Sequence, residues 1–155
     1  MPAIDRFQLE NQLCIALYDA YRAMTGAYRT ALGPVGLTYS QYAVMLALWE
    51  RDRTTLRDLG VLLHLDSGTL SPLLQRMERM GLIKRSRDLQ DERVLEVVLT
   101  DAGRALRPQA AAAQQSVEAM TGLNPDALGE LRDGLNALAR QMRQPITRTD
   151  APGAA

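Results

Sequence analysis

Cysteine, histidine and lysine each occur only once among the 155 residues. A single cysteine cannot form a disulfide within the chain, so redox chemistry would need the thiol alone, a small thiol or a second chain. The one histidine, His64, has no Cys, Asp or Glu around it at metal-ligand spacing, which favours a turn or a DNA-facing residue. We therefore expect no metal and no cofactor.

An excess of charge and a long apolar run are also missing. Acidic and basic residues number 18 each, so the formal net charge is zero and DNA binding would have to depend on a local basic patch. No apolar run approaches the roughly 18 residues that a membrane helix needs. The first residues, MPAIDRFQLENQ, lack the basic and apolar regions of a signal peptide. We expect a cytoplasmic protein that does not contact the membrane.

Apolar residues at helical spacing predict a long helix at each end of the chain. The first has no internal proline and ends at Gly33–Pro34. Near the other end, Thr100 caps one helix, and Asn124–Pro125 opens another. The predicted ranges are about 5–32, 101–121 and 124–144, followed by a frayed tail over 145–155.

The middle of the chain predicts three shorter helices. Thr38 and Thr55 each stand three residues before a Gln or an Asp, which is a capping pattern. The third helix, in DSGTLSPLLQRMERMG (66–81), has apolar residues on one side, Asp66 or Ser67 as its cap and Gly81 just past its end. Because Pro72 is tolerated in a first turn, we expect this helix to start late.

A β-hairpin is predicted after the third of these helices. In LIKRSRDLQDERVLEVVL (82–99) apolar residues alternate with period two, and a polar turn over 88–92 separates the two strands. Residues 52–54 are expected to form only a turn. A short helix, a tight turn, a helix with a polar outer face and then a hairpin is the order of a winged helix-turn-helix. We predict a mainly α fold with a small β-hairpin wing.

A basic patch coincides with this predicted DNA-binding element. Between Gln75 and Arg87 five basic residues face one acid, Glu78, so the local net charge is plus four (five minus one). Such a run is commonly a solvated helix face, but its coincidence with the element order favours DNA. Hydroxyl and amide side chains approach base edges, arginines hold phosphates, and Asp91 could orient the wing guanidinium of Arg93. The candidate DNA-binding residues are Ser67, Thr69, Ser71, Gln75, Arg76, Arg79, Arg87, Asp91 and Arg93.

Two long stretches of the sequence carry a family resemblance. LDSGTLSPLLQRMERMGLIKRSRDLQDERVLEVVLTDAGRAL resembles the DNA-binding core of MarR-type repressors, including the D-x-R element of the wing. NQLCIALYDAYRAMTGAYRTALGPVGLTYSQYAVMLALWE is similar to the organic-hydroperoxide-sensing OhrR branch, with one cysteine in NQLC. The resemblance covers roughly residues 9–107. It implies an obligate homodimer on operator DNA, with one domain over 1–155, a DNA-binding part over about 38–99 and dimerisation helices over about 5–32 and 101–144.

The single cysteine shares one side of the first predicted helix with tyrosines. Cys14, Tyr18, Tyr21 and Tyr28 follow one another at separations of four, three and seven residues. Phenolic O–H groups that donate to sulfur would favour the reactive thiolate. By motif the resemblance implies two such donors, Tyr28 and, from the second subunit, Tyr39, with Tyr18 near the site. Without it, a small buried hydrophobe among core tyrosines is the simpler interpretation.

The sequence thus predicts a redox-sensing transcriptional repressor and no enzyme. It would bind operator DNA while Cys14 is reduced and release it when an organic hydroperoxide oxidises that thiol, after which a mixed disulfide with a small thiol, a sulfenamide or overoxidation follows. A thiol peroxidase would need an activating Arg or a resolving Cys nearby, whereas Arg22 and Arg29 lie about two and four helical turns away. The alternative is a MarR-type regulator of a phenolic or lipophilic ligand with Cys14 passive.

Overall fold

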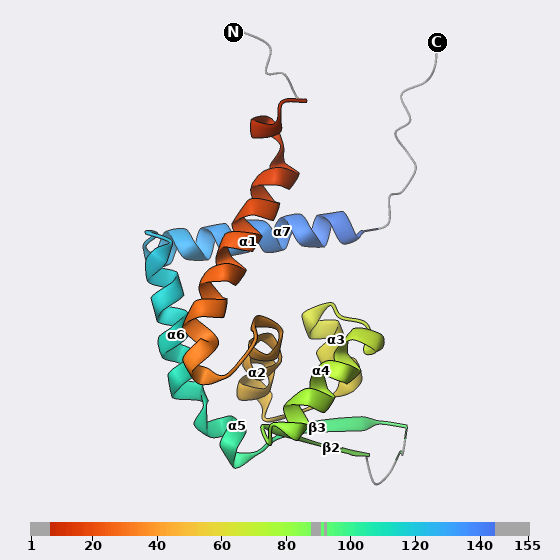
Figure 1. Ribbon diagram of the computed structural model, residues 1–155. Helices are drawn as coiled ribbons and strands as arrows, with labels where there is room; N and C mark the ends of the chain where they lie inside the picture. Colours follow the sequence, from red (N-terminus) through yellow and green to blue (C-terminus); the bar gives the residue numbers. More distant parts are fainter. Residues whose placement is uncertain (1–6, 88–90, 92, 145–155) are drawn as a thin grey trace, which may run out of the picture. The chain divides into compact units, whose positions relative to one another are not determined.

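The computed structural model describes residues 7–87, 91 and 93–144 (Figure 1). The chain divides into two compact units, within 1–117 and within 118–155. The elements are η1 (Leu9–Asn11), α1 (Leu13–Leu32), η2 (Gly33–Val35), α2 (Tyr39–Arg51), β1 (Arg53–Thr55), α3 (Leu56–Leu63), α4 (Ser67–Arg79), β2 (Ile83–Arg87), β3 (Leu95–Leu99), α5 (Asp101–Ala105), α6 (Arg107–Met120) and α7 (Pro125–Arg143).

The first α-helix starts later than the predicted residue 5. Leu9–Asn11 forms a short 3-10 helix, and Gln12 then has extended backbone (φ −90°, ψ 115°), so α1 begins only at Leu13. Residues 1–6 lie outside the described residues. At its other end α1 passes through η2 to Gly36, whose φ of 78° lies in the left-handed region that favours glycine.

Side-chain caps begin the helices of the middle region. Thr38 Oγ1 accepts from the backbone N–H of Gln41 while Gln41 Oε1 accepts from that of Thr38, which completes the predicted capping box at α2. Thr55 Oγ1 likewise accepts from the Asp58 N–H at 3.0 Å and starts α3. These caps confirm the predicted starts of both helices.

The late start predicted for α4 is wrong. Asp66 Oδ1 accepts from the backbone N–H of Thr69 at 2.8 Å, and Oδ2 accepts from the Thr69 hydroxyl at 3.2 Å. These two hydrogen bonds hold the pKa of the Asp66 carboxyl below its usual range. The cap fixes the first helical residue at Ser67, so Pro72 lies inside the helix and beyond its first turn. Gly81 follows the helix with a φ of 75°, as its predicted role past the end requires.

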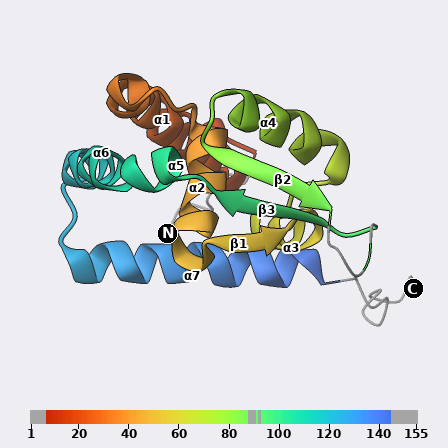
Figure 2. The same ribbon diagram turned by 90° about the horizontal axis from the view of Figure 1, so that it is seen from below.

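The sheet has one strand more than the predicted hairpin. Its antiparallel order is β1-β3-β2, so β3 is the central strand, with Thr54 and Arg85 on either side of Val97 (Figure 2). The prediction that residues 52–54 form only a turn is therefore wrong: Asp52 turns the chain with a φ of 61°, and a strand follows at once. Most of the predicted turn over 88–92 lies outside the described residues.

The core of the first unit lies between α2, α3, α4 and the sheet. Where one helix was predicted over 101–121, two are found, α5 and α6, because Pro108 cannot donate the i→i−4 hydrogen bond that would continue the helix. In the second unit Asn124 caps α7 as predicted, by accepting from the Ala127 N–H at 2.9 Å. Fully buried residues of the core include Val44, Met45, Leu48, Leu59, Leu70, Leu74, Met77 and Val97.

The mainly helical winged helix-turn-helix fold predicted from the sequence is confirmed. Helices α3 and α4, joined by a tight turn at His64, are followed by the β2–β3 wing (Figure 1). In the described part of the chain no helix is both long enough and apolar enough to cross a membrane.

Candidate functional site

Helix α4 divides its residues between the core and solvent. Leu70, Leu74 and Met77 are fully buried, which fixes the rotation of the helix and turns the opposite side outward. Of the predicted DNA-facing residues, Thr69, Gln75, Arg76 and Arg79 lie on that side and are exposed. Ser71 is half-buried, and Ser67 is exposed because it is the first residue of the helix.

The wing residues predicted to meet DNA are also exposed. Arg87 ends β2, and Asp91 and Arg93 lie in the connection toward β3. Asp91 Oδ1 accepts from the backbone N–H of Arg93 at 3.0 Å, a contact that shapes the turn ahead of the arginine. The predicted pairing of Asp91 with the Arg93 guanidinium stays a prediction.

An ion pair joins α4 to the wing. Glu78 Oε1 accepts from the backbone N–H of Arg85 at 2.9 Å, and Oε2 lies 2.8 Å from the Arg85 guanidinium. These hydrogen bonds hold the pKa of the Glu78 carboxyl below its usual range. Arg85, counted in the sequence as part of the basic patch, is therefore engaged within the protein. The opposite charges of Glu78 and Arg85, seven residues apart across the Gly81 turn, are the sequence signal for this ion pair.

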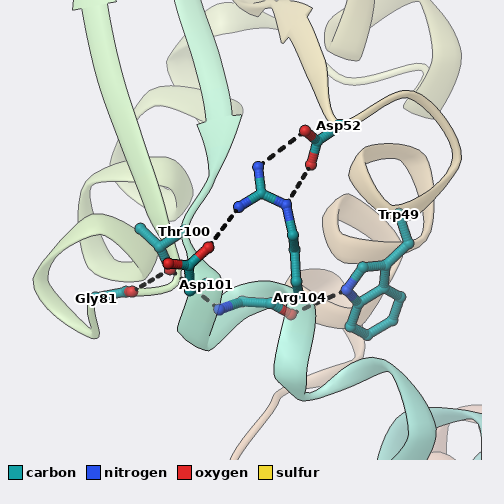
Figure 3. Close-up of polar contacts among 7 residues, drawn as sticks. Trp49, Asp52, Gly81, Thr100, Asp101 and Arg104 are labelled. Atoms are coloured by element: carbon teal, nitrogen blue, oxygen red, sulfur yellow. Dashed lines mark hydrogen bonds and ion pairs between the residues drawn. The ribbon is translucent and has the colours of Figure 1, made fainter.

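A second set of contacts fastens α5 to the end of α2 (Figure 3). The Arg104 guanidinium meets Asp52 through two hydrogen bonds, of 2.9 and 2.8 Å, and Asp101 through a third, of 3.0 Å. The hydrogen bond from Arg104 holds the pKa of the Asp52 carboxyl below its usual range. Because the guanidinium and the Asp52 carboxylate are both planar and share two hydrogen bonds, the pair fixes the orientation of α5 relative to the end of α2 as well as the distance between them.

The same joint includes the turn after α4. Thr100 Oγ1 donates to the carbonyl oxygen of Gly81 at 2.6 Å (Figure 3). The indole N–H of Trp49 donates to the carbonyl oxygen of Gly103 at 3.0 Å. A Cβ added at Gly103 would lie 2.2 Å from the backbone oxygen of Leu82. The helix α5 thus lies directly against the start of the wing, and only glycine fits at the point of contact.

Three tyrosines pack together where α1 ends and α2 begins. The ring of Tyr28 lies 5.4 Å from that of Tyr39 and 5.3 Å from that of Tyr42. The Tyr42 hydroxyl donates to Gln114 on α6 at 3.2 Å, and its ring lies 6.4 Å from that of Trp49. Burial raises the pKa of the Tyr39 phenol and nearby Tyr21 raises it further, so Tyr39 stays a hydrogen-bond donor at neutral pH.

The cysteine lies apart from this cluster within one chain. Cys14 is exposed on the first turn of α1, and exposed Tyr18, one turn later, has the Arg22 guanidinium 5.5 Å from its ring centre. Tyr28 is fourteen residues further along the same unbroken helix, a rise of about 21 Å. The structure therefore brings together Tyr28 and Tyr39, but it does not bring either to the thiol of their own chain.

A hollow of about 690 Å³ opens beside the tyrosine cluster. Tyr21, Thr25 and Arg29 of α1 form one wall, and Tyr39 and Ser40 of α2 form another. Among the described residues there is no group of three or more side chains suited to hold a metal ion.

The chain is similar in sequence to a known protein family. A family profile described as "Transcriptional regulator SarA/Rot" matches residues 28–108, from the end of α1 into α6. The chain belongs to this family. Two relatives of this SarA/Rot-family chain are the HTH-type transcriptional regulator TtmR of Methylorubrum extorquens, 40% identical over 97% of the chain and 77% of that protein, and the organic hydroperoxide resistance transcriptional regulator of Bacillus subtilis, 39% identical over 90% and 95%.

Solved structures agree with this assignment. Reduced AbfR bound to DNA superposes with a TM-score of 0.74 at 34% identity, over 90% of this chain and 98% of that one. A MarR-family regulator from Rhodococcus sp. RHA1 superposes with a TM-score of 0.78 at 25% identity, over 86% and 96%. The MarR-type and OhrR resemblance read from the sequence is confirmed. This SarA/Rot-family chain is a DNA-binding transcriptional regulator and not an enzyme, as predicted.

Proposed function

We propose that the protein is a homodimeric repressor that holds operator DNA while Cys14 is reduced and releases it when an organic hydroperoxide oxidises that thiol. The observation that carries this proposal is the complementarity of two places on one chain: an exposed thiol at the start of α1, and a phenol cluster beside a hollow at its end. The similarity to the hydroperoxide resistance regulator of Bacillus subtilis supports the choice of oxidant.

Exposed apolar side chains argue for the second copy. Leu13, Tyr21 and Met24 lie on one side of α1 and are 62%, 61% and 39% exposed, and a contiguous apolar strip of this kind marks an interaction surface. In the second unit Leu131, Leu135 and Met142 of α7 are exposed as well. A two-fold axis near the middle of α1 would place the first turn of α1 in one copy against the last turn of α1 in the other copy.

In that arrangement both phenols come from the other subunit. The family motif implies that Tyr39 comes from the second subunit and leaves Tyr28 with its own cysteine, but the helical rise of about 21 Å separates Cys14 from its own Tyr28. Because the rings of Tyr28 and Tyr39 lie 5.4 Å apart, one subunit supplies both donors to the thiol of the other. Two phenolic hydrogen bonds would favour the thiolate without adding a charge.

Oxidation would remove these contacts. The thiolate attacks the terminal peroxide oxygen, an S–O bond forms, the O–O bond breaks, and the alkoxide takes a proton and leaves as the alcohol. A small thiol then displaces water from the sulfenic acid and forms a mixed disulfide. The disulfide is too bulky for the space between Tyr28 and Tyr39 in which the thiolate accepted its two hydrogen bonds. A chain of contacts links the proposed thiol site to the base of the wing: Tyr28 packs on Tyr42, and Tyr42 packs on Trp49. Trp49 in turn donates a hydrogen bond to Gly103.

Intact mass measured beside operator binding tests the proposal. Stoichiometric organic hydroperoxide, with and without a small thiol, is expected to add oxygen or the thiol to Cys14 in step with loss of operator binding. Release of DNA by a phenolic or lipophilic ligand, with an unmodified mass and no response to hydroperoxide, would instead favour the ligand-sensing alternative.

We expect phenylalanine at Tyr28 or Tyr39 to slow oxidation of Cys14 about five- to tenfold, because each loses about one hydrogen bond to the thiolate. Operator binding by the reduced protein should be nearly retained. Stopped-flow oxidation and the ultraviolet absorbance of the thiolate measure the effect. Tyr42→Phe is the matched control, since its hydroxyl is bonded to Gln114 and its loss should leave the rate unchanged. Equal rates in all three variants would mean that the tyrosines only pack.

Arg93→Ala should weaken operator binding about tenfold or more, because a dimer presents two exposed wing arginines to the DNA. The slope of affinity against salt should also become shallower. Arg132→Ala is the control, since Arg132 pairs with Asp133 on α7, outside the wing. Fluorescence anisotropy over a salt series measures both variants, and the oxidation of Cys14 should be unchanged. An affinity equal to that of the unsubstituted protein would remove the wing from the DNA interface.

A further inference from the structure

A single carboxylate joins α4 to strand β2, which is an edge strand of the sheet and lies beside that helix (Figure 2). On the outer edge of β2 the Arg85 N–H donates to Glu78 Oε1 at 2.9 Å. The guanidinium of Arg85 donates to Oε2 from Nε at 2.9 Å and from a terminal nitrogen at 2.8 Å. Glu78 thus binds both the backbone and the side chain of the residue in the middle of β2.

This contact is the second of two anchors between α4 and the wing. The first is at the turn, where the Thr100 hydroxyl donates to the carbonyl oxygen of Gly81. Arg85 lies four residues beyond that turn, on the strand that leads to the connection carrying Arg93. Hydrogen bonds between β2 and β3 hold the wing strands to each other, whereas the two anchors hold the wing to the helix. Because two anchors fix a direction and one does not, Glu78 sets the angle of the wing.

A fixed angle matters because a winged helix must meet DNA at two places together. Helix α4 presents its exposed side to the major groove, and the wing reaches toward a minor groove. In B-DNA these grooves are about 12 and 6 Å wide, so the two contacts stand at a set spacing. A wing already held at that spacing loses less conformational freedom when DNA binds, and the affinity is higher for that reason.

Charge alone would make Glu78 unfavourable at this place. It is the one acidic residue in the basic segment 75–87, and a carboxylate close to DNA repels the phosphates. It also engages the Arg85 guanidinium, which could otherwise hold a phosphate. If Glu78 contributed nothing but its charge, its removal would strengthen DNA binding. A positioning role predicts the opposite sign.

We propose that Glu78 is a positioning residue for DNA recognition, which fixes the wing relative to α4 so that Arg93 meets the DNA while α4 lies in the major groove. This inference goes beyond the redox response of Cys14 and rests only on the wing contact in the proposed function. It follows that loss of Glu78 weakens binding although it removes a negative charge. The binding that is lost is the part that Arg93 contributes.

A double-mutant cycle between Glu78 and Arg93 provides the test. Fluorescence anisotropy measures how tightly the reduced, full-length protein binds a labelled duplex selected from random sequence with the unsubstituted protein. We expect Glu78→Ala to weaken binding about fivefold. Arg93→Ala should cost about tenfold in the unsubstituted protein but only about twofold in the Glu78→Ala background. Glu130→Ala removes the same charge at an exposed position on α7 and should change neither value.

Glu78→Gln separates the hydrogen bond from the charge. It removes the same charge as Glu78→Ala but keeps an oxygen that can accept from the Arg85 N–H. This variant should therefore bind DNA more tightly than Glu78→Ala and keep more of the dependence on Arg93. Circular dichroism checks that each variant is folded, and the same cycle is measured with Glu78→Gln if Glu78→Ala does not fold.

The outcomes separate this inference from the proposed function. Binding by Glu78→Ala as tight as that of the unsubstituted protein, or tighter, would overturn the inference. A full tenfold cost of Arg93→Ala in the Glu78→Ala background would also overturn it, since Glu78 would then act on α4 and not on the wing. If Arg93→Ala has no effect in the unsubstituted protein, the wing contact and this inference fall together, and the response of Cys14 to hydroperoxide is untouched.

Discussion

Replacing Cys14 with serine is expected to leave operator binding by the untreated protein unchanged and to abolish its release by organic hydroperoxide. Cys14 is exposed on the first turn of α1 and takes no part in the core, so the substitution should cost the fold little. A hydroxyl is not oxidised by a peroxide under conditions in which a thiolate is. Electrophoretic mobility shift with increasing hydroperoxide measures the response of both proteins.

The unsubstituted protein should respond in two stages. Because the chain has no second cysteine, hydroperoxide alone can give only species such as the sulfenic acid, which keeps much of the size and hydrogen bonding of the thiol. Release should therefore be partial with peroxide alone and complete when a small thiol is added. Reductant should restore binding after the mixed disulfide, but not after sulfinic or sulfonic acid has formed.

Release of DNA by the serine variant would place the sensor elsewhere, most readily at a methionine. Met24 is 39% exposed on α1, whereas Met45 on α2 is fully buried. A mass increase on a tryptic peptide that contains Met24 would then identify the residue, and the sensing role proposed for Cys14 would be wrong.

Gly103→Ala is expected to lower the free energy of unfolding by about 3 kcal/mol. The new Cβ would lie 2.2 Å from the backbone oxygen of Leu82, and neither α5 nor that turn can move freely. Thr100 and the Arg104–Asp52 ion pair hold the two sides together. Urea denaturation followed by circular dichroism measures the loss, and operator affinity should fall with it, because α5 and the wing must separate to admit the methyl group.

Gly134→Ala is the matched control for this prediction. Gly134 is an exposed position within α7, where an added Cβ meets nothing within 4 Å in the described structure. Alanine is favoured over glycine inside a helix by up to about 1 kcal/mol, so this variant should be as stable as the unsubstituted protein or slightly more so. A Gly103→Ala variant with the stability of Gly134→Ala would show that the contact with Leu82 is looser than the structure has it.

Features that depend on neighbours along the chain could be predicted from the sequence. Thr38, Thr55 and Thr100 each accept a hydrogen bond from the backbone N–H three residues later, and the helices begin where these caps predict. Features that depend on distant partners were missed. Strand β1 is only three residues long, too short to show an alternation, and it exists because Thr54 pairs with Val97 far along the chain.

The thiol site shows the same limit of sequence reasoning. Helical spacing correctly places Cys14 and Tyr28 on one side of α1, but residues on one side of a helix can be far apart along its axis. The cluster of Tyr28 with Tyr39 depends on how α2 folds back against α1, and no local pattern encodes that distance.

Trp49 is the only tryptophan of the chain, and it lies at the joint between α2, α5 and the wing. Its indole N–H is bonded to Gly103, and its ring lies 6.4 Å from that of Tyr42. Indole fluorescence responds to such hydrogen bonds and aromatic neighbours, so the protein carries an intrinsic optical probe between the tyrosine cluster and the wing. Emission from one residue, without any label, can be followed in real time while hydroperoxide, small thiol and operator are added in turn.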